Sequence, residues 1–246
     1  MNISRSWSAV TCLSFASLVV GAPPAAACPV VEEAAVVPAT LAAASLGSKL
    51  AVGDVVFIRI GGPGPFREVA AATGSWTNHV GVVVDVAGEE PLVAESAVPF
   101  SRITPLSRFV ARSQGGHVAV RRLAFELTPL QRQSVVTAAH SRLGVLYDTG
   151  FDLHSHRQFC SRYVREVLLE ATGHSVGEVE TFATLLTRQP GAKLGFWRAW
   201  YFGRIPWQRE TVTPASVLAS AELRPVFDGT VTRPVTPSRP TPPTSR

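Results

Sequence analysis

The sequence contains little cysteine and little lysine, with three cysteines and two lysines among 246 residues. Three cysteines are too few to suggest a framework of disulfides. Nearly all of the positive charge comes from arginines scattered singly along the chain, and no basic stripe interleaved with aromatics supports nucleic-acid binding, despite a pI of about 9.6. We therefore expect no nucleic-acid partner, and we expect the net charge of +5 to favour anionic wall polymers or phospholipid headgroups.

The N-terminal region also lacks a hydrophobic run long enough to cross a bilayer. Trp7 to Val20 is mostly apolar but falls short of the about 20 apolar residues that a bilayer requires. Arg5 precedes this run, and three alanines at 25–27 follow it as a cleavage site. The pattern predicts that residues 1–27 are a signal peptide and that the mature protein is periplasmic or secreted.

Cys28 follows the predicted cleavage site directly, which is where a lipoprotein carries its lipid. The bulky aliphatic residue usual three places earlier is Ala25 here, so an outer-membrane lipoprotein is the less favoured interpretation. Membrane association depends on that lipid in this interpretation. Because Cys12 leaves with the signal peptide, an intrachain disulfide would have to join Cys28 to Cys160, and chemistry explains a lone cysteine deep in an exported chain better than a crosslink does.

The overall composition, 46% hydrophobic and 17% charged, is typical of one globular domain with tails. Residues 28–49 are rich in Ala, Val and Pro without a period, which predicts a linker before a folded domain at 50–227. Residues 228–246 are rich in Pro, Thr, Ser and Arg, which predicts a disordered tail. The glycine- and proline-rich run at 61–65 lacks the Lys-Ser/Thr pair of a phosphate loop and is predicted to be a plain connection.

Hydrophobic periodicity and turn residues predict strands alternating irregularly with helices. The strands are expected at 55–60, 79–86, 91–96 and 117–123, and the helices at 66–73, 104–109, 129–143, 160–172 and 178–188, with a last helix after Thr213. An aromatic cluster at 197–207 is expected to cap the core or to line a groove.

Cys160 is the residue with the strongest chemical signal. Apolar residues at three- and four-residue spacing from Phe159 to Ala171 predict a buried helical stripe, and Gly173 supplies its stop. Cys160 therefore stands in the first turn, where unpaired backbone N–H groups and the helix dipole favour a thiolate. The alternative is a small buried residue without chemical duty, which is common for free cysteine.

His79 and Glu95 lie on two strands of a predicted hairpin. A turn centred on Ala87 or Gly88 places the two side chains on the same face, opposite or diagonal to one another, whereas a slip of one residue separates them. The alternative interpretation is structural: His79 would be a strand-end histidine bonded to backbone, and Glu95 would be a solvated residue at the sheet edge.

These three residues are the set that acyl transfer by a thiol requires: Cys160 as nucleophile, His79 as base and later acid, and Glu95 to orient the imidazole. The backbone N–H of Cys160 is the first candidate for an oxyanion donor. A competing interpretation places zinc on His154, His156 and Cys160, but no second cysteine or clear fourth ligand accompanies them. We therefore expect no metal and no cofactor.

Several short segments together resemble the circularly permuted branch of the NlpC-type papain-like cysteine hydrolases, specifically the YiiX-like proteins. The resemblance spans about residues 50–222. The segments are 53–57 (Gly-Asp-Val-Val-Phe), 78–82 (Asn-His-Val-Gly-Val), 94–95 (Ala-Glu), 144–148 (ending Tyr-Asp), 159–164 (Phe-Cys-Ser-Arg-Tyr-Val) and 213–216 (Thr-Pro-Ala-Ser). The resemblance implies a papain-like α+β fold in which an antiparallel sheet packs against the helix that carries the catalytic cysteine.

Carried over by motif, the family's cysteine, histidine and acidic residue fall on Cys160, His79 and Glu95. The resemblance also suggests substrate-binding positions at Tyr147 and Asn78. Arg162 departs from the family, since relatives often have an acidic residue two places after the cysteine, and it suggests an acidic or carboxylate-bearing substrate.

Three functions remain open from the sequence. The first is an exported cysteine amidase or peptidase that cleaves cell-wall peptide, a peptidoglycan fragment or a related amide through a thioester. The second is a lipid ester hydrolase or acyltransferase of the lecithin retinol acyltransferase type. The third is a wall- or lipid-binding module without catalysis. The sequence leaves the oligomeric state undetermined.

Overall fold

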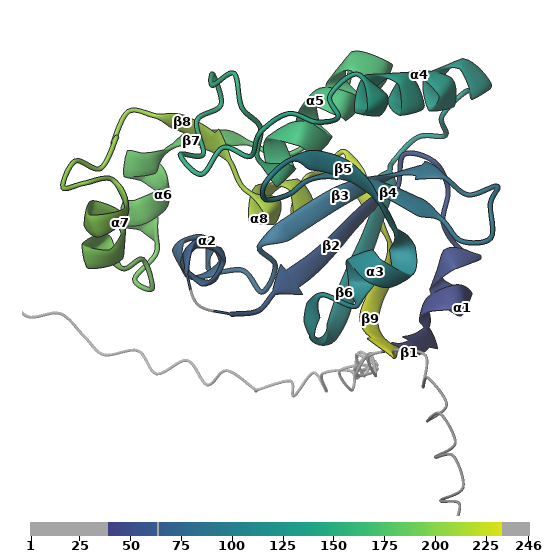
Figure 1. Ribbon diagram of the computed structural model, residues 1–246, viewed down its shortest axis with the longest axis horizontal. Coiled ribbons are helices and arrows are strands. Elements are labelled where there is room, and N and C mark those ends of the chain that lie inside the picture. The colour runs from purple at the N-terminus through teal and green to yellow at the C-terminus, as the bar shows by residue number, and fades with distance from the viewer. Residues whose placement is uncertain (1–38, 63, 233–246) are drawn as a thin grey trace, which may run out of the picture. The chain divides into compact units, whose positions relative to one another are not determined.

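A mixed sheet of seven strands forms the centre of the computed structural model, which describes residues 39–62 and 64–232. Its order is β1-β9-β6-β2-β3-β4-β5, and every neighbouring pair is antiparallel except β1 with β9 (Figure 1). The predicted signal peptide, Cys28 and the chain after Thr232 lie outside the described residues. The strands are β1 Ala39–Ala42, β2 Val55–Ile60, β3 His79–Asp85, β4 Leu92–Ser96, β5 Ser101–Pro105, β6 Ser113–Leu123 and β9 Leu223–Thr232.

Helices cover both faces of this sheet. The helices are α1 Ala43–Gly47, α2 Pro65–Thr73, α3 Leu106–Val110, α4 Pro129–His140, α5 Cys160–Thr172, α6 Phe182–Arg188, α7 Leu194–Trp200 and α8 Pro214–Leu218, and a small ribbon pairs β7 Val179–Thr181 with β8 Glu210–Val212. In Figure 1, α4 and α5 lie together on one side of the sheet, and α1 and α3 lie on the other. Among the described residues, no helix has both the length and the apolar character needed to span a membrane.

The alternation of β2 explains why its sequence is a continuous apolar run. Val55 and Phe57 pack in the cluster that contains α4 and α5, whereas Val56 and Ile58 pack in the cluster that contains α1 and α3. A strand that is buried on both faces has no solvent-facing side, so its sequence does not alternate between apolar and polar residues. The prediction of a buried strand at 55–60 is confirmed.

Helix α5 follows the predicted stripe. Its buried side chains include Tyr163, Val164, Val167 and Leu168, and it ends at Gly173 with φ 78°, a left-handed conformation that glycine adopts without strain. The Tyr163 hydroxyl donates to the carbonyl of Ala139 on α4 at 2.7 Å, which ties the two helices together.

A third apolar cluster, separate from the two sheet faces, joins α2, α6 and α7. Its buried residues are Ala72, Phe182, Leu186, Trp197 and Ile205. The aromatic segment therefore forms a small core of its own beside the start of α5, and it lines a cavity described below.

Several predicted boundaries were wrong. The predicted linker at 28–49 contains β1 and α1, and β9 continues to Thr232 and so includes the first five residues of the predicted tail. Both strands are formed by pairing with segments far away in the sequence, since β9 lies between β6 and β1 in the sheet. The predicted helix at 104–109 begins only at Leu106, because β5 extends to Pro105 against β4. The predicted helix at 178–188 begins at Phe182, because residues 179–181 pair with β8.

Candidate active site

Cys160 is the first residue of α5, as predicted, and it is a free, buried thiol. The preceding cap residue, Phe159, has extended backbone and no side-chain acceptor, so no cap side chain competes for the N–H groups of the first turn. The first turn contains no acidic residue either. The helix dipole therefore acts on the sulfur without a carboxylate in the same turn to oppose it.

His79 and Glu95 face one another across β3 and β4. The register pairs Val83 with Val93, so that His79 and Glu95 share a face and lie diagonally across the two strands. The Nε2 atom of His79 lies 2.6 Å from Oε2 of Glu95, and both side chains are fully buried. The hairpin geometry predicted from the sequence is present.

Gly81 makes room for this pair. A Cβ atom at position 81 would lie 2.5 Å from Cγ1 of Val93 and 3.0 Å from the ring of Phe109. The Phe109 ring packs 5.7 Å from the His79 ring, measured between centroids. The glycine two residues after the histidine thus allows β3, β4 and α3 to approach closely around the imidazole.

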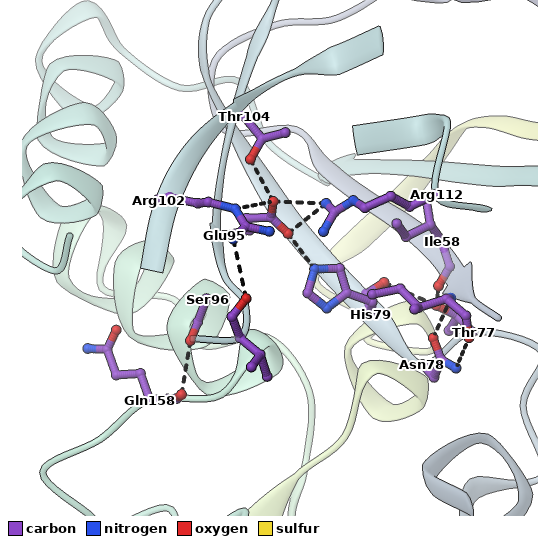
Figure 2. Close-up of polar contacts among 12 residues, drawn as sticks. Ile58, Thr77, Asn78, His79, Glu95, Ser96, Arg102, Thr104, Arg112 and Gln158 are labelled. Atoms are coloured by element: carbon purple, nitrogen blue, oxygen red, sulfur yellow. Dashed lines mark hydrogen bonds and ion pairs between the residues drawn. The ribbon is translucent and has the colours of Figure 1, made fainter. Parts of the chain in front are cut away.

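Glu95 has further partners that the sequence did not predict (Figure 2). Thr104 Oγ1 donates to its Oε1 at 2.6 Å, and Nη2 of Arg112 lies 2.8 Å from Oε1 and 2.7 Å from Oε2. Nε of Arg102 forms a longer ion pair at 3.5 Å. Burial by itself would raise the pKa of Glu95, but His79, Arg112 and Thr104 outweigh it and hold the pKa at about 2. Glu95 is therefore an anion at any physiological pH.

The second ring nitrogen of His79, Nδ1, is buried and has no aligned hydrogen-bond partner among the described residues. It is the nitrogen left to exchange a proton with Cys160, and such bonds are often poorly aligned before substrate binds. Burial lowers the pKa of His79, but the thiolate of Cys160 and then Glu95 raise it to about 9. The favoured state is therefore an imidazolium.

The thiol is shifted in the opposite direction. Burial raises the pKa of Cys160, yet the charge of His79 and its hydrogen bond, the backbone N–H of Val80 and the hydroxyl of Tyr147 together bring the pKa below its ordinary value. Cys160 and His79 thus form a thiolate–imidazolium pair, which is the reactive form of a cysteine nucleophile.

Tyr147 lies against the sulfur, where its hydroxyl bonds to the side chain of Cys160 and also meets the Cys160 backbone N–H. Burial and then the negative charge of Cys160 raise the pKa of Tyr147 well above its ordinary value, which keeps the phenol protonated as a donor. Its backbone is held by a bond from its N–H to the carbonyl of Pro99 at 2.9 Å and by a bridge to Gln158.

Asn78 reaches the same region but uses its amide internally. Its Oδ1 accepts from the Ile60 N–H at 2.8 Å, and its Nδ2 donates to the carbonyls of Ile60 and Phe66 at 3.0 and 2.9 Å. The side chain borders the cavity beside Cys160. These bonds connect the end of β2 to the start of α2 and so position the cavity wall.

The structure does not bring Arg162 into the cavity. Its guanidinium binds Glu166 at 2.7 Å and the carbonyls of Ser155 and Arg157 at 2.5 and 2.8 Å. Arg162 thus anchors the loop before α5. This role could not be predicted from the sequence, because the path of the loop depends on the tertiary structure.

A narrow cavity of about 30 Å³ opens beside Cys160. Its walls come from α2, the start of α5, α6, α7, β8 and the segment after it, and from Asn78, Tyr147 and Phe151. Apart from the Cys160 thiolate, no lining side chain is charged. The lining residues are Phe66, Val69, Ala72, Thr73, Asn78, Tyr147, Phe151, Phe159, Cys160, Ser161, Phe182, Leu185, Trp197, Thr211, Val212, Thr213 and Pro214. The site is therefore suited to an apolar group next to the thiolate.

In the part of the chain that the structure describes, the histidines considered for zinc are not part of a group of three or more candidate metal ligands. His154 and His156 are exposed, and Nε2 of His154 instead meets Oε2 of Glu210 at 2.8 Å. Within residues 39–62 and 64–232, no three His, Cys, Asp or Glu side chains gather in a way that could hold a metal ion.

The sheet, the cysteine helix and the buried His–Glu pair define a papain-like thiol hydrolase architecture. The chain belongs to the permuted papain-like amidase family, YaeF/YiiX, C92, whose model matches residues 49–227. It is 31% identical over 176 residues to the protein named "Uncharacterized protein YiiX" from Escherichia coli (strain K12), a match that covers 71% of this chain and 84% of the relative.

A solved structure shows the same fold. The crystal structure of a protein described as the metalloprotein yiiX from Escherichia coli O157:H7 superposes with a TM-score of 0.68 and 28% sequence identity, covering 74% of this chain and 99% of that one. The predicted YiiX-like family and the predicted papain-like α+β fold are confirmed.

Proposed function

We propose that this protein is an exported cysteine amidase that cleaves an amide in cell-wall peptide or a related compound. The observation that carries the proposal is the buried constellation at the start of α5, where the charge of His79 favours the Cys160 thiolate and Glu95 lies 2.6 Å from His79. The amidase family supports a peptide-type substrate. Export rests on the signal-like pattern of residues 1–27.

The chemistry follows from the positions of the protons. The Cys160 thiolate attacks the amide carbonyl, the carbon–nitrogen bond breaks, and imidazolium His79 gives its proton to the departing amine. A water molecule then loses a proton to the now neutral His79 and attacks the thioester, which releases the carboxylic acid and restores the thiolate–imidazolium pair. Glu95 holds the ring by Nε2 throughout, so that Nδ1 carries the transferred proton.

The hydroxyl of Tyr147 and the backbone N–H of Cys160 are the donors that we assign to the developing oxyanion, because both lie at the sulfur. We expect Tyr147→Phe to lower turnover roughly 10²-fold, the usual cost of one oxyanion donor. Alkylation of the thiol at high pH, where the thiolate is complete without help, should remain within a few-fold of wild type. Equal losses in both assays would mean that Tyr147 only packs against the site.

The apolar cavity favours a second candidate, a lipid ester as acyl donor. Its walls are mostly aromatic and aliphatic, and they lie directly beside Cys160. The same thioester would form, with an alcohol instead of an amine as the leaving group.

Covalent trapping tests both candidates. We expect incubation with wall peptides to add an acyl mass to Cys160, seen by intact-protein mass spectrometry and abolished in Cys160→Ala. An acyl mass from phospholipid alone would replace the amidase proposal with the lipid ester. If neither adds mass, and Cys160→Ala binds a wall or lipid ligand as tightly as wild type, the protein is a binding module and the proposal fails.

A further inference from the structure

The outer side of α7 and the loop that follows it present an unusual combination of exposed side chains. Phe202 is 97% exposed, the highest value among the large hydrophobic side chains of the described residues. Trp207 is also exposed, Trp200 is half-buried, and Arg198 and Arg204 are exposed beside them. We refer to these five residues as the α7 surface. An aromatic side chain left wholly in water at such a place calls for a partner.

The backbone holds Phe202 outward. Its φ of 50° is in the left-handed region, which a bulky residue adopts only when neighbouring contacts impose it. Those contacts are the bonds from the N–H of Phe202 to the carbonyl of Ala199 at 3.2 Å and from the N–H of Gly203 to the carbonyl of Arg198 at 2.7 Å. The exposed ring is therefore a feature of an ordered turn.

Charge on this part of the chain has one sign. The segment from Phe182 to Arg209 contains no Asp or Glu. It contains five basic residues, which are Arg188, Lys193, Arg198, Arg204 and Arg209. Arg209 is used internally, bonding to the carbonyl of Gly150 at 2.8 Å and pairing with Asp152 at 3.5 Å. The side chains of Arg198 and Arg204 form no hydrogen bond or ion pair with any described residue, so their charges are available to a partner.

A shallow depression of about 630 Å³ adjoins Phe202 and Arg204. Its far side is formed by Thr149 and Gly150, to whose carbonyls the Trp200 indole and the Tyr201 hydroxyl donate, each at 2.9 Å. These bonds make the depression a rigid feature, and Arg204 at its edge can reach an anion that enters it.

We propose that the α7 surface docks on an anionic phospholipid bilayer, with Phe202 inserted among the headgroups and Arg198 and Arg204 on lipid phosphates. A protruding apolar ring, neighbouring tryptophans and unpaired arginines match the chemistry of that interface. The amidase activity is not needed for this docking. Because Trp197 on the inner side of α7 lines the catalytic cavity, docking places that cavity's wall at the membrane surface.

Vesicle sedimentation tests the proposal with the chain that begins at Cys28, the proposed mature form, unlipidated. We expect it to bind vesicles that contain phosphatidylglycerol and to bind pure phosphatidylcholine weakly, with binding that weakens as salt is added. Arg198→Gln and Arg204→Gln should each lower the partition coefficient about fivefold, the contribution of one basic side chain at an anionic surface. Phe202→Ser should lower it about tenfold through lost insertion of the ring.

Two matched controls lie on other elements. Leu130→Ser removes another exposed apolar side chain, on α4, and Arg108→Gln removes another exposed arginine without a side-chain partner, on α3. Both should bind as wild type does. Circular dichroism verifies the fold of each variant.

Equal losses in the controls and in the α7 variants would overturn the proposal, as would equal binding to neutral and anionic vesicles. Self-association that depends on Phe202, without vesicle binding, would assign the surface to a second copy of the chain and overturn it as well. None of these readouts involves turnover, so a failed amidase proposal leaves the result unaffected.

Discussion

His79→Ala should reduce the rate at which iodoacetamide alkylates Cys160 at neutral pH by about two orders of magnitude. The imidazolium is a principal group that keeps the buried thiol ionised, and without it burial dominates and only a few per cent or less of the thiol is ionised at pH 7. In wild type the thiolate should be present well below the ordinary thiol range. In the variant, alkylation should rise only at alkaline pH.

The pKa of about 9 for His79 also sets an alkaline limit on hydrolysis. Hydrolysis needs the protonated ring to expel the amine, so kcat/KM should fall as pH rises through about 9 while alkylation does not. His154→Ala is a matched control, because that ring is exposed and pairs with Glu210. An unchanged alkylation profile in His79→Ala would show that the thiol is not activated by this histidine, and the proposed mechanism would be wrong.

Glu95→Gln should lower the free energy of unfolding by about 3 kcal/mol, the lower end of the cost of breaking a buried ion pair. The lower end applies because Arg112, which loses its carboxylate partner, keeps 28% of its side chain exposed and retains some contact with water. The change also weakens the hold on the imidazole and lowers the pKa of His79. Urea unfolding measures the first effect, and the pH dependence of kcat/KM measures the second.

The same residue predicts a dependence of stability on acid. The pKa of Glu95 is about 2 in the folded protein and 4.5 without the fold around it. Its contribution to the free energy of unfolding is therefore complete above about pH 4.5 and is lost as pH falls towards 2. The Glu95→Gln variant should lack this loss of stability between about pH 4.5 and 2. Glu90→Gln is the control, since Glu90 accepts bonds from Ser107 without a buried cation and should change stability by less than about 1 kcal/mol. Equal effects of the two substitutions would contradict the role given to Glu95.

The local features of the site could be predicted because they depend on short-range periodicity. The stripe from Phe159 to Ala171 and the stop at Gly173 placed Cys160 at a helix start. The turn between β3 and β4 set the register that puts His79 and Glu95 on one face. Arg102 and Thr104 were within reach of the same argument, because the next hairpin pairs Glu95 with Arg102.

Arg112 could not be predicted in this way. It follows α3, and its contact with Glu95 depends on how α3 packs against β4 and β6. Asn78 and Arg162 were expected to touch substrate, yet their polar atoms bind the chain's own backbone and, for Arg162, Glu166. A single sequence does not reveal which backbone carbonyls of a folded loop will need a hydrogen bond from a side chain.

The amino-acid sequence by itself indicated the family through short motifs that resemble its members. It also determined the α+β class and pointed to the candidate reactive residues, because strand alternation, helical spacing and turn chemistry act over a few residues. The tertiary structure alone decided that Arg112 reaches Glu95, that α6 and α7 line an apolar cavity beside Cys160, and that β9 continues to Thr232. These features arise from contacts between segments far apart in the chain, and their register becomes defined only when the whole core packs.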